Sequence, residues 1–239
     1  MAASTTVILV PGFLCDDTVW EPQRMALEQA GATVTIAEHG LLDSLGAMAE
    51  SILAYAPSRF ALAGHSMGGR VALEVQRRAP GRVSHLALLD TGCLPLPAGA
   101  AGERERRARH ELLEIGRRQG MRPMAERWVQ TMVHPDRLHD RVLVDRIVDM
   151  LARRTPLHQA QQVKALLARP DASEVLRGVR CPALVLCGRE DQTADVAHHE
   201  YMAGLVRDAQ LVVLERCGHM CTLEQPAAVA AQLCDWVRR

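Results

Sequence analysis

Short apolar runs alternate with amphipathic stretches along most of this chain of 239 residues. Runs rich in Val, Ile, Leu and Ala, which are typical of buried parallel strands, occupy residues 6–10, 60–63, 85–89 and 183–186. Residues 33–37 and 210–214 show a weaker strand pattern. Stretches with the apolar spacing of helices occupy residues 19–30, 43–55, 67–79, 196–205 and 227–238. This alternation predicts an α/β fold in which a mostly parallel sheet is flanked by helices.

The alternation stops between residues 94 and 178. Four helical stretches follow one another there without a strand, at residues 103–119, 121–132, 135–153 and 156–168. The strand pattern then resumes near Cys181. We therefore predict one core formed by residues 1–93 and 179–239, with residues 94–178 inserted between two strands as an all-helical lid.

A run of alternating charges, from Glu103 to Arg109, lies in the first of these helical stretches. The spacing allows ion pairs four residues apart, from Glu103 to Arg107 and from Glu105 to Arg109. Because both signs are interspersed, the run is interpreted as a solvated helix face and not as a binding site.

Composition excludes several classes of partner. The 28 basic and 28 acidic residues balance, and aromatic residues make up 3% of the chain, so neither nucleic acid nor an anionic membrane is an expected partner. No leader-like segment and no long apolar run is recognised, which favours a cytoplasmic protein. Seven scattered cysteines indicate reduced thiols. The expected partner is a small-molecule substrate, and the oligomeric state stays open.

The motif Gly64-His65-Ser66-Met67-Gly68 follows a predicted strand and precedes a predicted helix. This strand–turn–helix context is that of a nucleophile elbow, in which a serine on a strained turn presents its hydroxyl to a reaction site. Side chains two residues away on either side would collide there, and glycine removes them. Ser66 is therefore the predicted nucleophile.

A serine hydroxyl needs a base and an orienting carboxylate. His219 follows the predicted strand 210–214, whereas His198 and His199 are predicted to lie on a surface helix. Asp191 follows the predicted strand 183–186 and is preferred as the acid over Glu190 and Asp195. The order Ser66, Asp191, His219 along the chain is the one expected for a triad on this kind of sheet.

Further site residues are predicted around this triad. The backbone N–H groups of Phe13 and Met67 are candidates for an oxyanion hole. Candidate pocket residues, for which packing of the lid on the core is the alternative interpretation, are Leu14, Met124, Trp128, Met132 and Met220. No H-x-x-x-H or H-E-x-x-H pattern occurs, so neither a metal nor another cofactor is predicted.

At these residues the chain resembles the α/β-hydrolase superfamily over nearly its whole length. The matching pieces are Val10-Pro11-Gly12-Phe13, Gly64-His65-Ser66-Met67-Gly68-Gly69, Ala79-Pro80-Gly81-Arg82-Val83, Cys181-Pro182-Ala183-Leu184-Val185-Leu186-Cys187-Gly188, Asp191 and Gly218-His219. Within the superfamily the chain is similar to small lid-bearing bacterial enzymes, which include enol-lactonases, carboxylesterases and C–C bond hydrolases. Most relatives have His-Gly where this chain has Pro11-Gly12, so the rigidity of Pro11 is expected to hold that loop instead.

Three functions are compatible with these residues. The first is a serine hydrolase that cleaves a small carboxylic ester or lactone through an acyl-enzyme intermediate. The second is a C–C bond hydrolase that uses the same triad on a β-diketone or a dienoic acid. The third is a non-catalytic binding protein that retains the fold, which the presence of all three triad positions disfavours.

Overall fold

The computed structural model describes residues 5–239 and forms a parallel sheet at the centre of the molecule. Every pair of neighbouring strands is parallel, and the strand order is β2-β1-β3-β4-β5-β6. The strands are β1 (Thr6–Val10), β2 (Thr33–Ile36), β3 (Phe60–His65), β4 (Val83–Leu89), β5 (Ala183–Gly188) and β6 (Gln210–Leu214). The predicted fold class is confirmed.

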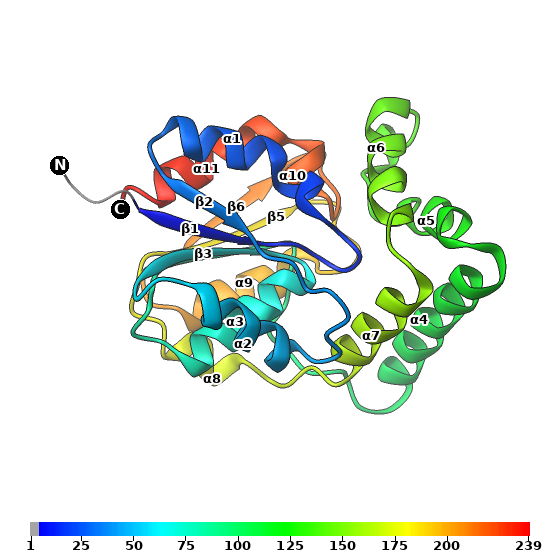
Figure 1. The fold of residues 1–239 in the computed structure, drawn as a ribbon, viewed down its shortest axis with the longest axis horizontal. Helices are drawn as coiled ribbons and strands as arrows, with labels where there is room; N and C mark the ends of the chain where they lie inside the picture. Colours follow the sequence, from blue (N-terminus) through cyan, green and yellow to red (C-terminus); the bar gives the residue numbers. More distant parts are fainter. Residues whose placement is uncertain (1–4) are drawn as a thin grey trace.

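Helices cover both faces of this sheet (Figure 1), which explains why β3 and β5 are buried along their whole length. One face carries η1 (Asp17–Trp20), α1 (Glu21–Gln29), α10 (Cys221–Glu224) and α11 (Pro226–Trp236). The other face carries α2 (Leu45–Tyr55), α3 (Met67–Arg78), α8 (Ser173–Arg177) and α9 (Val196–Leu205). Such two-sided burial produces the continuous apolar runs seen in the sequence.

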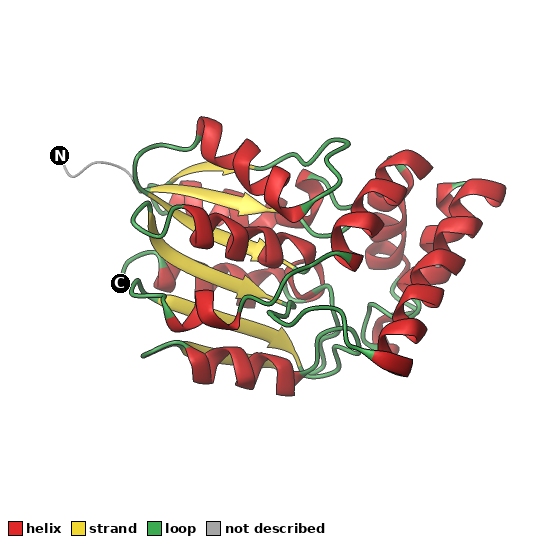
Figure 2. Cartoon of the chain, turned by 90° about the horizontal axis from the view of Figure 1, so that it is seen from below, coloured by secondary structure: helices red, strands yellow, loops and turns green. Residues whose placement is uncertain are grey.

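The helical insertion, defined here as α4–α7, lies between β4 and β5 in the sequence. It consists of α4 (Gly99–Gln119), α5 (Met121–Val129), η2 (Pro135–Arg137), α6 (Arg141–Ala152) and α7 (Pro156–Leu167). These helices lie beyond the carboxyl ends of the strands (Figure 1 and Figure 2). The predicted stretch 135–153 is split because Asp140 caps α6 by accepting from the Leu143 N–H.

The helix α8 falls within the predicted lid segment 94–178, but it contacts α3 and α9. The boundary at residue 178 therefore stays a prediction.

The strand order determines where the loops after neighbouring strands run in opposite directions. From β1 the chain continues to β2 toward one edge of the sheet, whereas from β3 it continues to β4 toward the other edge. The carboxyl ends of β1 and β3 consequently open a crevice, the usual place for a ligand on such a sheet. No helix in residues 5–239 is both long and apolar enough to cross a membrane.

Candidate active site

Ser66 occupies a strained turn between the end of β3 and the start of α3. Its φ of 54° and ψ of −120° lie outside the conformations that non-glycine residues usually adopt. A Cβ atom on Gly64 would lie 2.3 Å from the carbonyl oxygen of Gly68, and one on Gly68 would lie 2.1 Å from that of Val10. Both glycines are therefore required sterically, as the motif predicted.

The structure brings Ser66, His219 and Asp191 into one hydrogen-bonded chain. Ser66 Oγ lies 2.8 Å from His219 Nε2, and His219 Nδ1 lies 2.8 Å from Asp191 Oδ2. His219 and Asp191 are both buried. When Asp191 is ionised, Nδ1 carries the imidazole proton, and Nε2 is free to accept the proton of the serine hydroxyl.

The surroundings of Asp191 favour its ionised form. Burial raises the pKa of this carboxyl, but the charge and hydrogen bond of His219 and the N–H groups of Ala194 and Thr193 outweigh that effect and lower it. The two N–H groups donate to Asp191 Oδ1 at 3.0 and 2.7 Å.

The competing acids have other partners. Glu190 accepts from the Cys217 N–H at 2.9 Å, and Asp195 caps α9.

A buried carboxylate holds the loop that carries His219. Glu224 Oε1 accepts from the N–H groups of Gly218 at 3.0 Å and Met220 at 3.2 Å, and Oε2 accepts from the His134 N–H at 2.9 Å. Burial raises the pKa of Glu224, and these three donors oppose the increase. The flanking residues of His219 are thus tied to α10 and to the segment after α5. Glu224 lies in no motif that the sequence predicted to be functional.

Replacing Glu224 with alanine is expected to lower the free energy of unfolding by about 2–4 kcal/mol, because three buried N–H groups lose their acceptor. Hydrolytic activity should also fall, since the His219 loop loses its anchor. Urea denaturation and steady-state kinetics measure the two effects. Glu215, which is exposed, provides the matched control Glu215→Ala. Equal stability of the two variants would contradict the anchoring role.

The loop after β1 passes directly beside the serine. A Cβ atom on Gly12 would lie 3.1 Å from Ser66 Cβ. Phe13 and Met67 both line the adjoining cavity, and within residues 5–239 neither backbone N–H has a hydrogen-bond acceptor. Their position and free donors fit the predicted oxyanion hole.

Two hydrogen bonds hold this loop in addition to the rigidity of Pro11. His39 Nε2 donates to the Pro11 carbonyl at 3.0 Å, and the Leu14 N–H donates to Gln162 Oε1 of α7 at 2.7 Å. Burial lowers the pKa of His39, so the neutral ring that makes this single donation is favoured. A histidine distant in sequence therefore supports the loop although the usual His-Gly is absent.

A cavity of about 530 Å³ opens at Ser66 and His219. Trp128, one of the predicted pocket residues, lines it, and its ring meets Phe13 edge-to-face with centroids 5.1 Å apart. The described lining residues do not include the other predicted pocket residues, which are buried in the hydrophobic core: Leu14, Met124, Met132 and Met220. The predicted helix 121–132 assumed one continuous face, but α5 ends at Val129.

Met132 instead contributes its backbone. Its carbonyl accepts from the His219 N–H at 2.6 Å. The methionine side chain packs in the core, so helical spacing alone was a poor guide to the pocket.

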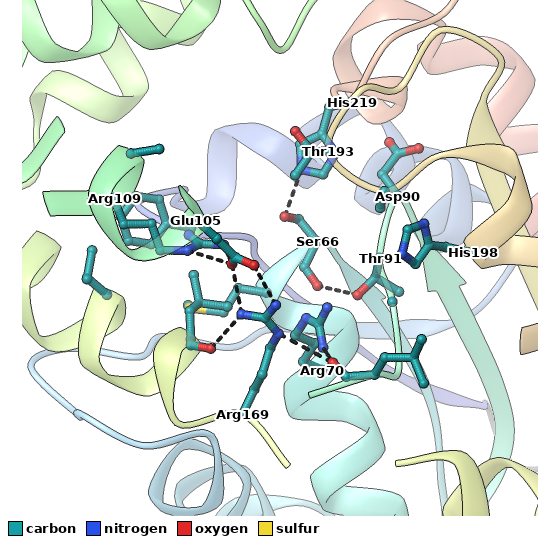
Figure 3. Close-up of a pocket in the computed structure, with 18 of the residues that line it drawn as sticks. Ser66, Arg70, Asp90, Thr91, Glu105, Arg109, Arg169, Thr193, His198 and His219 are labelled. Atoms are coloured by element: carbon teal, nitrogen blue, oxygen red, sulfur yellow. Dashed lines mark hydrogen bonds and ion pairs between the residues drawn. The ribbon is translucent and has the colours of Figure 1, made fainter. Parts of the chain in front are cut away.

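The interpretation of the charged run as a solvated helix face was wrong for two of its members. Glu105 and Arg109 pair as expected, at 2.8 Å, but both line the cavity (Figure 3). Arg169 adds a second partner to Glu105 at 2.7 Å. Glu103 pairs with Arg106 and not with Arg107. The charged run therefore has two different sides, because one side of α4 faces the cavity and the other faces solvent.

The surface position predicted for His199 was wrong, whereas His198 is exposed as predicted. His199 is fully buried, and its Nε2 accepts from the Thr91 N–H at 3.0 Å, whereas His198 lines the cavity. Arg70, another lining residue, was missed although a signal existed. It follows Ser66 by four residues, and residues four apart lie on the same face of a helix. Within the described part of the chain, no group of three or more His, Cys, Asp or Glu side chains is arranged to hold a metal ion.

Comparison with known proteins matches residues 7–232 to the model of the family described as the alpha/beta hydrolase family. A putative carbamate hydrolase, RutD, of Escherichia coli (strain SMS-3-5 / SECEC) is 24% identical over 260 aligned residues, which cover 97% of this chain and 89% of the relative.

Two solved structures are similar over almost the whole chain. A thermophilic esterase from Thermogutta terrifontis superimposes with a TM-score of 0.84 and 27% identity, covering 99% of this chain and 90% of its own. The enol-lactonase from Burkholderia xenovorans LB400 has a TM-score of 0.86 and 20% identity, covering 100% and 93%. The second of these similarities concerns the fold alone.

Proposed function

This chain belongs to the alpha/beta hydrolase family, and on that premise we propose that it is a serine hydrolase that cleaves a small carboxylic ester or lactone through an acyl-enzyme intermediate. The observation that carries the proposal is the unbroken chain from Ser66 Oγ through His219 to Asp191, at 2.8 Å for each hydrogen bond. The serine end of this chain opens into the cavity.

The first half of the reaction forms the acyl-enzyme. Ser66 Oγ attacks the carbonyl carbon while its proton passes to His219 Nε2, and Asp191 stabilises the resulting imidazolium. The N–H groups of Phe13 and Met67 receive the negative charge that develops on the carbonyl oxygen. When the tetrahedral intermediate collapses, the C–O bond to the leaving group breaks, and the leaving oxygen takes the proton from His219.

The second half of the reaction repeats these steps with water as the nucleophile. His219 Nε2 accepts a proton from a water molecule as the water oxygen attacks the acyl carbon. Collapse of the second intermediate breaks the bond to Ser66 Oγ, which recovers its proton, and releases the carboxylic acid. A lactone follows the same course, except that the leaving hydroxyl stays on the product.

The cavity supports a small substrate. A volume of about 530 Å³ is within the usual range for small-molecule pockets. Its apolar wall includes Phe13, Trp128, Leu112 and Val163. The similarity to an esterase and to a putative carbamate hydrolase also favours attack on a carbonyl group.

The test is covalent labelling of the nucleophile. A fluorophosphonate probe is expected to phosphonylate the protein once, on the peptide that contains Ser66, as located by mass spectrometry. Ser66→Ala should abolish labelling, whereas Ser51→Ala, at an exposed position of α2, should not. Unlabelled Ser66 would contradict the proposal and favour a binding protein. A labelled protein that cleaves β-diketones but neither esters nor lactones would favour the C–C bond reaction.

A further inference from the structure

Three arginines gather in the cavity that Ser66 faces. Arg70 comes from α3, Arg109 from α4, and Arg169 from the segment after α7, and all three line the cavity together with Glu105 (Figure 3). Residues from such distant parts of the chain converge here because the helical insertion lies over the carboxyl ends of the strands. A cluster of this kind gives one end of the cavity a positive charge.

Two of the three cations already have a carboxylate partner. Arg169 binds Glu105 through both guanidinium ends, at 2.8 and 2.7 Å. Arg109 binds Oε1 of the same carboxylate at 2.9 and 2.8 Å. Burial raises the pKa of Glu105, but these arginines outweigh that effect and lower it to about 2. Glu105 is therefore ionised, and it is shared between two guanidinium groups.

Arg70 is the cation without a counter-charge. Its hydrogen bond goes to the Leu94 carbonyl at 2.8 Å, and no carboxylate lies within ion-pair distance of it among the described residues. Asp90, the other carboxylate that lines the described cavity, accepts from the N–H groups of Gly188 and Cys221 at 3.1 and 3.0 Å. Asp90 also pairs with His65 at 3.6 Å. The three guanidinium groups of the described cavity thus have one carboxylate, Glu105, between them, and Arg70 is the one that does not contact it.

The surroundings of Arg70 lower the cost of adding an anion. Burial, together with the charges of Arg169 and Arg109, lowers the pKa of Arg70 to about 9, so the guanidinium stays protonated at neutral pH. A partly desolvated charge without a partner is unfavourable, and a bound carboxylate would relieve it through charge-assisted hydrogen bonds.

A second polar group in the cavity also lacks a partner. Gln159, on α7, is fully buried and lines the cavity, yet within residues 5–239 neither its Oε1 nor its Nε2 has a hydrogen-bond partner. A buried polar group without a partner costs free energy unless a ligand or water satisfies it. The amide N–H group is a suitable donor to a carboxylate or to another substrate oxygen.

We propose that the preferred substrate of this cavity carries a free carboxylate, as does the half-ester of a small dicarboxylic acid, and that Arg70 binds that carboxylate while Ser66 attacks the ester carbonyl. The proposal rests on the function proposed above and adds the substrate class. The excess of positive charge in the cavity favours an anionic substrate, and the guanidinium fork of Arg70 matches the two oxygens of a carboxylate.

The test compares matched pairs of substrates. Mono-p-nitrophenyl esters of dicarboxylic acids from succinate to pimelate are compared with the same compounds whose free acid is capped as a methyl ester. Wild type is expected to show a kcat/KM about tenfold or more higher for the best anionic ester than for its capped counterpart, as a charge-assisted hydrogen bond allows.

Substitution of Arg70 then removes the preference. In Arg70→Gln, KM for the anionic ester should rise about 10–100-fold, while kcat/KM for the capped ester changes little. Arg70→Lys should restore part of the preference. Arg107→Gln removes one positive charge from an exposed site on α4 and should leave the preference intact. A wild type without preference, or an Arg70→Gln variant that keeps it, would overturn the proposal.

Inhibition separates a carboxylate from a phosphate. Hexanoate and inorganic phosphate are compared as inhibitors of wild type, Arg70→Lys and Gln159→Leu. In wild type, hexanoate should inhibit more strongly than hexanamide, and the inhibition by hexanoate should be weaker in Gln159→Leu. Stronger inhibition by phosphate than by hexanoate would overturn the carboxylate assignment. If Arg70→Gln does not fold, Arg70→Lys and these inhibitors decide the question.

Ligand binding to the Ser66→Ala variant distinguishes the carboxylate site from the proposed hydrolase function. Calorimetric titration of this variant with hexanoate, and with hexanamide as the neutral control, measures recognition of the carboxylate without chemistry. Binding of hexanoate that disappears in Ser66→Ala/Arg70→Gln supports the role of Arg70 even if fluorophosphonate labelling fails. Labelling of Ser66 together with equal binding of hexanoate and hexanamide would refute the carboxylate site and leave the hydrolase function standing.

Discussion

Ser66→Ala is expected to lower kcat for ester hydrolysis by about 10⁵–10⁶-fold, because the reaction loses its nucleophile and with it the acyl-enzyme route. Steady-state kinetics with a p-nitrophenyl ester that wild type accepts measures the effect. The variant should fold normally, since the turn conformation is maintained by Gly64 and Gly68 and not by the hydroxyl. Some rate above the uncatalysed reaction should persist, because the proposed oxyanion donors, the N–H groups of Phe13 and Met67, are still present.

His219→Ala should cause a loss of similar size. If Ser66 and His219 act as one unit, the double variant is no slower than either single variant, because the second substitution removes a group that no longer has a function. Additive losses would mean that the two residues act in separate steps. Retention of wild-type turnover by Ser66→Ala would refute the serine mechanism.

Asp191→Asn is expected to lower kcat by about 10⁴-fold. The asparagine amide group would donate a hydrogen bond to His219 Nδ1, which drives the imidazole proton to Nε2. In that tautomer Nε2 cannot accept the proton of Ser66, although the side chains keep their places. The measurement is kcat near neutral pH, with the near-ultraviolet circular dichroism spectrum as evidence of an unchanged fold.

Asp195→Asn is the matched control, because Asp195 lies four residues away and caps α9 without contacting His219. Its activity should stay close to that of wild type, since asparagine is also a good N-cap residue. Equal losses in both variants would show that the acid has been assigned to the wrong residue.

The same carboxylate links stability to pH. Burial raises the pKa of Asp191 in the folded protein, but His219 and two N–H groups lower it below the ordinary value of 3.8. A depressed folded pKa stabilises the protein above the unfolded pKa, and this contribution is lost as the pH falls through the folded value. In urea denaturation at decreasing pH, wild type should therefore lose stability over this acidic range more steeply than Asp191→Asn.

Local steric and periodic rules determined much of this protein from the sequence. Continuous apolar runs are typical of strands that are covered on both faces, as β3 and β5 are. The predicted strands agree closely with β1–β6, although the edge strands β2 and β6 are only partly buried. Gly64 and Gly68 are required because a Cβ atom on either would collide with backbone atoms, which lie a few residues away for Gly64 and at the end of the neighbouring strand β1 for Gly68. Ser66, Asp191 and His219 each follow such a strand, and the carboxyl ends of parallel strands lie at one edge of the sheet, so their proximity could be anticipated.

The pocket depended on contacts that no local rule describes. Met124 of α5 and Met132, which lies beyond the end of α5, both pack in the hydrophobic core and not in the cavity. His39 supports the loop at Pro11 from 28 residues away, and Arg169 meets Glu105 across 64 residues.

The sequence by itself thus determined the sheet, the strained turn at Ser66 and the placement of Ser66, Asp191 and His219 at one edge of the sheet, because backbone sterics and strand burial act over short stretches of chain. Only the tertiary structure decided that Arg70 shares a cavity with Arg109 and Arg169 and that, within residues 5–239, no carboxylate lies at ion-pair distance from it. Whether a charge is balanced depends on every group that folding brings near it, and that is a property of the packed molecule.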